Sequence, residues 1–378
     1  MRTSRGLLVS LAAASLLVAA CGAGATPTPA PTAAPTAAPT AAPTAAPTPA
    51  PTPTPVAYKA CQVSDTGGID DKSFNQNAWK GMQDAAAKLG IEVKFLESRT
   101  AADYEKNINQ FVAEKCDMIV TVGFLLGDAT KVAAEANPGI RFAIVDFAYD
   151  PAIPNTEGLV YSTNEAAMLV GYVSAGMSKS GIMGTFGGIN IGGPVTDFMD
   201  GFVAGANYYN AEKGTKVRVL GWDPLKPKEG SFTGNFDSTD DAKALTVPML
   251  QEGADVILPV GGPIGGGAYA ALQESAAEDY GIGVDVDWTQ TAPQYTDILL
   301  TSILKKIDVS VAGAVERAFN KVPASPVFVS TLANGGVDMG PFNAFEAKVP
   351  QELKDGAAAL KAKIISGEVK VKDYFAAK

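Results

Sequence analysis

The chain has 378 residues, a length that accommodates two domains and a large buried core. Its formal net charge is −10 at pH 7, which argues against nucleic-acid binding, because that function needs a basic face. The chain contains no histidine, which excludes a Ser–His–Asp or Cys–His nucleophile pair and every zinc site that uses imidazole.

Residues 1–20 have the pattern of a secretory signal peptide. Arg2 and Arg5 precede an apolar stretch that ends at Ala20 and is too short for a membrane-spanning helix. The stretch closes on "VAACG", which resembles a bacterial lipobox and makes Cys21 the expected lipidated residue. The alternative is an ordinary signal peptide with a chance cysteine. We expect a lipid-anchored protein on the extracytoplasmic face of the cell membrane.

Residues 21–55 are almost entirely Ala, Pro and Thr, with the near-repeat "PTAAPTAAPTAAPTAAPTPAPTPTP". Such a segment cannot bury enough apolar surface to offset its ordering entropy, so we predict a disordered linker. Its prolines favour an extended spacer between a folded body and a membrane.

The first half of the body alternates short apolar runs with helical patterns. A first helix is predicted from apolar residues at helical spacing, and Gly90 ends it. The predicted strands are "YKACQVSD", "EVKFLES", "CDMIVTVG" and "RFAIVD". Strands that alternate with helices predict a parallel sheet covered by helices on both faces.

The pattern pauses over residues 155–177 and then starts again. The strands predicted next are "GIMGTFGG", "KVRVLGW", "DVILPVGG" and "GIGVDVD", with helices over 195–206, 240–252 and 268–278. A further strand and helix are predicted in 297–320, followed by "PVFVSTL" and a C-terminal helix. The fold class is therefore α/β, with two doubly wound halves and late segments that cross back between them.

Ligands of such folds bind outside the carboxyl ends of the parallel strands. The segments that follow these ends carry carboxylates and rings rather than basic side chains, among them Asp65, Phe74, Phe124, Asp128, Phe198, Phe236 and Asp285. Carboxylates accept hydrogen bonds from hydroxyls and amines, and rings stack on flat faces. This chemistry suits a neutral, planar ligand with hydroxyl groups, and it suits phosphate poorly.

A glycine tract at 261–267 permits another interpretation. Gly265, Gly267 and Ala270 match G-x-G-x-x-A, and Asp285 lies near the spacing of the ribose-binding acid of a dinucleotide site. A tight strand–helix turn explains the glycines more simply, and backbone that contacts a ligand is a third possibility. We predict no cofactor.

Several side chains leave alternatives open. Asp70 and Asp71 are expected to be helix N-terminal acids rather than metal ligands, with Ser73 as the N-cap, and no metal is predicted. Phe74 either packs on the sheet or faces the cleft. Cys61 and Cys116 form either a disulfide or two buried thiols, and Lys305 is either solvated or directed inward.

The body resembles the basic membrane protein family of bacterial lipoproteins, and within it the purine nucleoside receptors of ABC transporters. The matching stretches include "DTGGIDDKSFNQNAWKG", "VGFLLGD", "GGPVTDFMDGFVAGA", "VILPVGG", "IGVDVD" and "LLTSILKKIDVSV". The resemblance implies a type I periplasmic-binding-protein fold with two lobes and a three-crossover hinge. We expect lobe 1 in 56–162 plus about 298–325, and lobe 2 in about 163–297 plus 326–378.

The resemblance also implies roles for individual residues. Phe74 would stack on a base whose edge bonds Asp128, with Asp65 and Asn75 also facing the cleft. The ribose hydroxyls and the opposite aromatic wall would involve Gly261, Asp285, Lys305, Phe198 and Phe236. The chain departs from the family pattern at Trp288, where a glutamine is usual.

We therefore expect a non-enzymatic, lipid-anchored receptor that captures guanosine, inosine or adenosine and delivers it to an ABC permease with its ATPase subunits. Two alternatives remain at this stage. One is a nucleoside-processing hydrolase, since acids near a ribose could serve that chemistry. The other is a binding protein for a different small ligand, such as a sugar.

Overall fold

The computed structural model describes residues 57–275 and 278–377. The predicted signal peptide (1–20), the lipidation site Cys21 and the linker (21–55) therefore lie outside the described residues. The elements below all belong to one compact unit, Pro53–Lys378. Within the described ranges, no helix combines the length and the apolar character that crossing a membrane requires.

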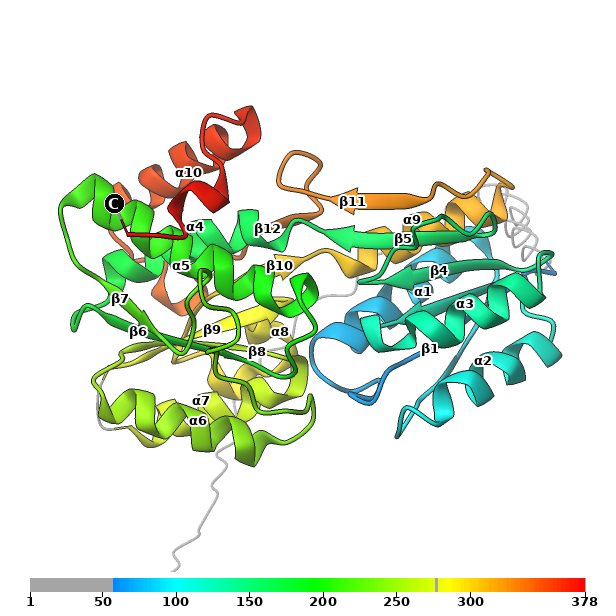
Figure 1. The fold of residues 1–378 in the computed structure, drawn as a ribbon, viewed down its shortest axis with the longest axis horizontal. Coiled ribbons are helices and arrows are strands. Elements are labelled where there is room, and N and C mark those ends of the chain that lie inside the picture. Colours follow the sequence, from blue (N-terminus) through cyan, green and yellow to red (C-terminus); the bar gives the residue numbers. More distant parts are fainter. Residues whose placement is uncertain (1–56, 276–277, 378) are drawn as a thin grey trace, which may run out of the picture. The chain divides into compact units, whose positions relative to one another are not determined.

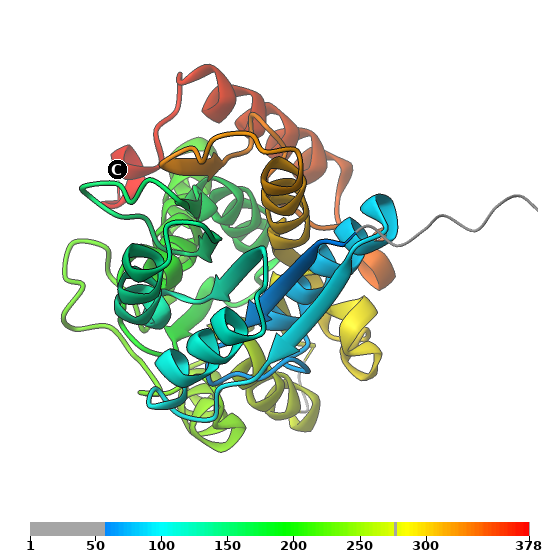
Figure 2. The ribbon, with the colours of Figure 1, turned by 90° about the vertical axis from the view of Figure 1, so that its right-hand side faces the viewer.

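The first of two six-stranded sheets has the order β11-β5-β4-β3-β1-β2, and its strands are all parallel (Figure 1). Its strands are β1 (Lys59–Val63), β2 (Glu92–Leu96), β3 (Met118–Val122), β4 (Arg141–Val145), β5 (Thr156–Tyr161) and β11 (Val327–Ser330). Helices α1 (Phe74–Leu89) and α9 (Ile307–Phe319) pack together on one face, and α2 (Asp103–Ala113) and α3 (Gly127–Ala136) on the other (Figure 2).

The second sheet has the order β12-β10-β9-β8-β6-β7, in which only β12 runs antiparallel to its neighbour. Its strands are β6 (Ile182–Gly187), β7 (Arg218–Leu220), β8 (Val256–Val260), β9 (Tyr280–Asp285), β10 (Leu299–Lys305) and β12 (Val337–Met339). The helices around it are α4 (Thr163–Met177), α5 (Gly193–Lys213), α6 (Thr239–Gln251), α7 (Gly265–Glu274), α8 (Trp288–Thr291) and α10 (Gln351–Ser366).

The central strands of both sheets are buried on both faces. Every residue of β3, β8, β9 and β10 is buried, as expected for parallel strands that helices cover on two sides. The first helix follows the predicted spacing, since Ala78, Met82 and Ala85 are buried and Gly90 ends the helix in a left-handed conformation.

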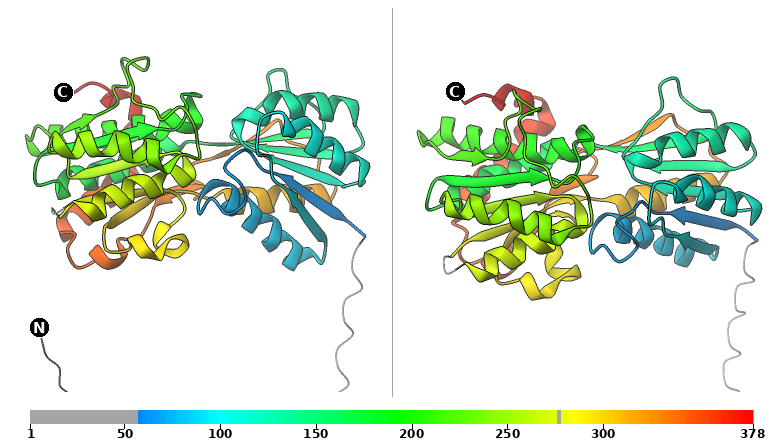
Figure 3. Two further views of the ribbon diagram at one scale, coloured as in Figure 1. Left: turned by 90° about the horizontal axis from the view of Figure 1, so that it is seen from below. Right: turned by 60° about the horizontal axis from the view of Figure 1, so that its bottom comes forward.

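The two sheets repeat one strand order, with β2-β1-β3-β4-β5 in the first and β7-β6-β8-β9-β10 in the second. The described chain passes between the sheets three times, after β5, after β10 and after β11 (Figure 3). This architecture confirms the predicted α/β class and the three crossovers of a type I periplasmic-binding fold.

The sheet memberships correct two of the expected lobe boundaries. Strand β10, expected in lobe 1, pairs with β9 in the second sheet, and β11, expected in lobe 2, pairs with β5 in the first. The local sequence of an apolar strand does not specify its partner, because strand pairing depends on contacts that are distant along the chain.

The alternation of strand and helix patterns pauses in the sequence over 155–177, but the structure continues there with strand β5 and helix α4. Helix α4 has an unbroken buried run from Ala166 to Ala175 and packs between α5, α10 and the second sheet. A helix covered on all sides shows no apolar stripe, so its sequence carries no helical period.

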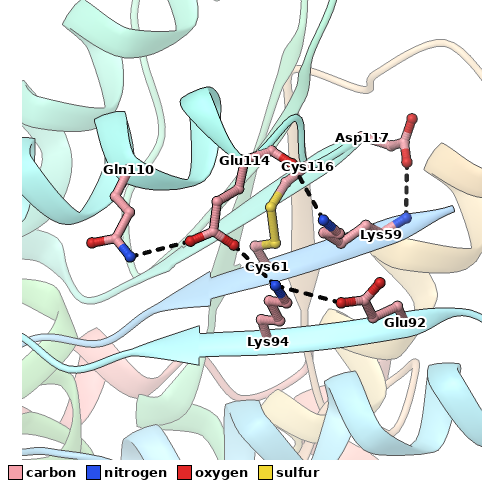
Figure 4. A network of polar contacts seen from close by, with 8 residues as sticks. All are labelled: Lys59, Cys61, Glu92, Lys94, Gln110, Glu114, Cys116 and Asp117. Carbon is pink, nitrogen blue, oxygen red and sulfur yellow. Dashed lines mark hydrogen bonds and ion pairs between the residues drawn. A yellow bond between two sulfur atoms is a disulfide. The ribbon is translucent and has the colours of Figure 1, made fainter.

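Cys61 and Cys116 form a disulfide, which decides between the two alternatives. The bridge joins Cys61 in β1 to Cys116, two residues before β3 begins, and it lies in an apolar cluster with Tyr104, Ile108 and Phe111. Polar contacts surround it, including the Lys59 amide that donates to Asp117 Oδ2 at 2.8 Å (Figure 4).

Candidate functional site

A cavity lies where the carboxyl ends of both sheets meet. Its lining comes from the last residues of β8, β9 and β10 and from the segments that follow β1, β3, β4, β6, β7 and β8. The residues that line it are Asp65, Gly67, Asp71, Phe74, Asn75, Gly123, Phe124, Leu125, Asp146, Ile191, Pro194, Val195, Phe198, Phe236, Val260, Gly261, Gly262, Pro263, Val284, Asp285 and Lys305.

The N-terminus of α1 forms one wall, and the carboxylate of Asp71 caps it. Asp71 accepts hydrogen bonds from the backbone amides of Ser73 at 3.0 Å, Asn75 at 2.7 Å and Gln76 at 3.1 Å. Ser73 occupies the N-cap position, as predicted, but its side chain makes no capping bond. The capping acid is therefore Asp71, and its burial raises its pKa to about 7 despite these bonds.

Asn75 links the two acids of this wall. Its Nδ2 donates to Asp65 Oδ1 at 2.7 Å and to Asp71 Oδ2 at 3.1 Å. Its Oδ1 is buried without a hydrogen-bond partner in the described chain. A buried acceptor without a partner is costly, so this carbonyl oxygen is suited to a donor group of a ligand.

Lys305 points inward, which settles the second open alternative. The residue is 1% exposed, and its Nζ donates to Asp146 Oδ2 at 2.5 Å. The ammonium also lies over three rings, 5.0 Å from the centroid of Phe74, 4.9 Å from that of Tyr161 and 5.7 Å from that of Phe198. Because it lines the cavity, a ligand can contact the same charge.

Asp146 and Asp285 occupy equivalent positions in the two halves. Asp146 follows β4 and Asp285 ends β9, the fourth strand of each repeated order. Both residues have a positive φ, 67° and 66°, a conformation that costs most side chains energy. Such backbone strain clusters at functional sites, where it aims a side chain at a ligand.

The cavity has an excess of negative charge. The carboxylates of Asp65, Asp71, Asp146 and Asp285 line it, and within the described chain Lys305 is the one cation among the lining residues. Burial is the largest cause that raises the pKa of each of these acids, to about 6 for Asp146, whereas Lys305 opposes the rise at Asp146 and Asp285. Hydroxyl and amine donors would stabilise the ionised forms.

Aromatic rings come from both halves. Phe74 lines the cavity from α1, so of its two predicted placements the structure supports the cleft-facing one. Phe198 and Phe236 line it from α5 and from the loop before α6. The Phe236 ring lies close to Gly188 and Gly261, where a Cβ would come within 2.3 Å and 3.2 Å of it.

The glycine tract has a structural explanation. Gly261 and Gly262 line the cavity, whereas a Cβ at Gly267 would lie 1.8 Å from the carbonyl oxygen of Thr239 at the start of α6. Close packing of α7 on α6 thus requires glycine there, with no need of a dinucleotide. Trp288 is 2% exposed and packs on Tyr269, so this departure from the family pattern lies in the core rather than on the cavity wall.

The structure brings the predicted ligand-binding residues together with one exception. Asp65, Phe74, Asn75, Phe198, Phe236, Gly261, Asp285 and Lys305 line the cavity, whereas Asp128 is exposed on α3 and does not. Sequence reasoning missed Asp146 and Asp71 as cavity-lining residues, although it correctly expected Asp71 as an acid at the N-terminus of the first helix. Asp146 is the last residue of the predicted strand "RFAIVD", so the rule about strand ends could have found it.

Comparisons with known proteins agree with this arrangement. Residues 59–374 match the sequence model of a family described as Bmp: ABC transporter substrate-binding protein PnrA-like. The chain is 30% identical over 330 residues to the ABC transporter nucleoside-binding protein BmpA of Lactococcus lactis, which covers 83% of this chain and 88% of that protein.

Two further similarities support the same assignment. The chain is 30% identical over 272 residues to basic membrane protein A of Borreliella burgdorferi, which covers 71% of this chain and 72% of that one. It also resembles the crystal structure of an ABC transporter solute-binding protein from Aeropyrum pernix K1, with a TM-score of 0.73 and 26% identity over 83% of this chain and 92% of that chain.

Proposed function

The chain belongs to the Bmp family of ABC transporter substrate-binding proteins, and we propose that its own ligand is a nucleoside, with purine nucleosides preferred. Members of this family bind substrates for transport and are not enzymes. The cavity between the ends of the two sheets is then the ligand site, and a membrane permease is the partner that receives the ligand.

One observation carries the proposal, namely that rings and carboxylates from both halves meet around one cavity. A purine has a flat face on which rings can stack, and its edge carries N–H donors. A ribose adds hydroxyl donors. The raised pKa values of the acids mean that the cavity gains most from a ligand that supplies hydrogen-bond donors.

The proposed roles follow the placement of the side chains. Phe74 stacks on one face of the base, and Phe198 and Phe236 form the opposite wall. Asp285 and Lys305 hold the ribose hydroxyls, together with the backbone at Gly261. Asp65 and the free carbonyl oxygen of Asn75 contact the ligand from the first half.

The geometry favours Asp146 over Asp128 for the base edge. Asp146 lines the cavity and is held by Lys305, whereas Asp128 is exposed outside it. A carboxylate accepts hydrogen bonds from the N–H groups of a 6-oxopurine, so this assignment predicts that guanosine and inosine bind well.

We also infer how the protein is held at the membrane and which transporter subunits it works with. Cys21 carries the lipid, the linker spaces the body from the membrane, and the permease works with ATPase subunits. The chain path suggests that lobe 1 comprises 57–161 with 307–330, and that lobe 2 comprises 163–305 with 337–377.

The test uses the full-length protein in detergent, freed of bound ligand by unfolding and refolding. Thermal unfolding is followed with guanosine, inosine, adenosine, the free bases, ribose and other sugars, because ligands that bind the folded state raise the melting temperature. We expect a concentration-dependent rise with purine nucleosides and none with ribose or base alone. A rise with sugars only, or release of free base from inosine, would refute the proposal.

A further inference from the structure

Ser73 connects the two halves beside the cavity without lining it. The residue is fully buried at the N-terminus of α1, whose helix packs with the first sheet. Its Oγ donates to Asp285 Oδ2 at 2.7 Å and lies 3.1 Å from the carbonyl oxygen of Val284, both at the end of β9 in the second sheet. A side chain of one half therefore holds a cavity carboxylate of the other.

The geometry of this contact is fixed from both sides. The backbone amide of Ser73 donates to Asp71 Oδ1 at 3.0 Å, so the residue is held in place by the acid that caps α1. A serine hydroxyl has one proton, and an ionised carboxylate is a stronger acceptor than a carbonyl. The bond to Asp285 is thus the dominant one while that acid is ionised.

In this arrangement the two carboxylate oxygens of Asp285 have different surroundings. Oδ2 is engaged by Ser73, and in the described chain no hydrogen bond to Oδ1 is observed. Since Asp285 lines the cavity, Oδ1 is the oxygen left for a hydroxyl of a ligand. The rotamer of the carboxylate is set by a residue that reaches it from the first half.

We propose that Ser73 is a positioning residue that orients the Asp285 carboxylate for the ligand and couples ligand binding to the approach of the two halves. This inference rests on the proposed function of the cavity. It predicts that removal of the hydroxyl weakens binding through Asp285, and that a ligand dissociates faster because the contact between the halves is lost.

The pH dependence distinguishes this role from a structural one. Burial raises the pKa of Asp285, and Lys305 from β10 and the Ser73 hydroxyl oppose the rise. The other titratable groups that interact with it are Asp65, Asp146, Tyr161 and Tyr269. Without the Ser73 hydroxyl the pKa of Asp285 rises further. On acidification S73A should therefore lose its affinity for the ligand at a higher pH than the wild type does.

The experiment compares Ser73→Ala, Asp285→Asn and the double variant with the wild type by calorimetry, using the nucleoside that stabilises the wild type best. A hydrogen bond to a buried charge predicts about a 10- to 100-fold loss of affinity in S73A. In the D285N background, S73A should have little further effect, because the two residues act through one contact.

Two further variants separate positioning from folding. Ser73→Gly also removes the hydroxyl, and glycine is well tolerated at an N-cap, so it replaces S73A in the cycle if S73A does not fold. Ser98→Ala is the matched control, since Ser98 is 1% exposed, accepts from Asn107 Nδ2 at 3.0 Å and does not line the cavity. It should keep the wild-type affinity and pH profile.

The outcomes are distinct. A wild type that binds no nucleoside overturns the proposed function and this inference with it. A wild type that binds, with wild-type affinity and pH profile in S73A or S73G, overturns the role of Ser73 alone. Additive losses in the S73A and D285N cycle would also refute it, because they would show that Ser73 acts elsewhere.

Discussion

The ammonium of Lys305 lies 2.5 Å from Asp146 Oδ2, and the pair joins the last residue of β10 in the second sheet to the residue after β4 in the first. Both side chains are buried, so the two charges are shielded from water and interact strongly. Both residues also line the cavity, so the charges that stabilise the body are the same charges that a ligand would contact.

Lys305→Met should therefore lower both stability and affinity. Removing one partner of a buried ion pair costs about 3–5 kcal/mol, because the other charge is left without compensation. Urea unfolding at pH 8 measures the loss. Lys80→Met is the control, since Lys80 is exposed and pairs with Asp84 on the surface of α1, and it should change the free energy of unfolding by less than about 0.5 kcal/mol. Equal effects of the two variants would contradict the prediction.

Asp146→Asn and Asp128→Asn make the same chemical change at a lining and a non-lining position. We expect D146N to weaken binding of guanosine about 10-fold or more, because an amide replaces a charged acceptor, and D128N to leave it unchanged. Calorimetry of both variants checks this. A loss in D128N with none in D146N would restore the assignment made from the sequence.

The ligand-free protein should gain stability as the pH falls from 8 to 5. In the folded state burial raises the pKa to about 7 for Asp71 and for Asp197, which lies on α5, and to about 6 for Asp146, against an ordinary value of 3.8. Between these values the folded state binds more protons than the unfolded state, so the free energy of unfolding falls as pH rises, by up to about 1.4 kcal/mol per pH unit for each group.

Urea unfolding at pH 5, 6, 7 and 8 measures this slope. The acids whose pKa values are lowered, such as Asp103 and Glu278, titrate below this window and do not mask it. Asp197→Asn should reduce the slope, because one raised group is removed. A free energy of unfolding that increases from pH 5 to pH 8 would refute the prediction.

The Cys61–Cys116 bridge should stabilise the fold without affecting the ligand site. It closes a loop over a sequence separation of 55 residues, for which the chain-entropy account gives about 4 kcal/mol. The double variant C61A/C116A should lose about that much in guanidinium unfolding and keep the wild-type affinity, because neither cysteine lines the cavity.

A reductant supplies the control for this experiment. It should destabilise the wild type under unfolding conditions and leave C61A/C116A unchanged. A wild type that unfolds at the same guanidinium concentration with and without reductant would show that the bridge contributes nothing to stability.

Much of the site was predictable because one rule governs it. The carboxyl ends of parallel strands share an edge, so residues such as Asp65 and Asp285, far apart in sequence, could be assigned to one cleft before their contacts were known. The same rule also covered Asp146, but the assignment of the base edge followed the family resemblance to Asp128 instead. The direction of Lys305 could not be settled, because a lysine after a buried strand either continues inward or turns to solvent.

Other features depend on contacts that no local pattern records. Ser73 and Asp71 are both competent caps, and Asp71 takes the role because the Ser73 hydroxyl is bound to Asp285 in the other half. The sheets to which β10 and β11 belong depend likewise on distant partners, as does the burial of α4.

The repeated strand order has a consequence for how a ligand is oriented. The two walls of the cleft present the same succession of strand ends, and at two of these the residues also match, Asp146 with Asp285 and Gly123 with Gly261. The proposed ligand, a nucleoside, is chemically different at its two ends. Its direction in the cleft must then be decided where the walls differ, for example after β1, where Asp65 lines the cavity, whereas the strand register gives Gly188 as its counterpart after β6.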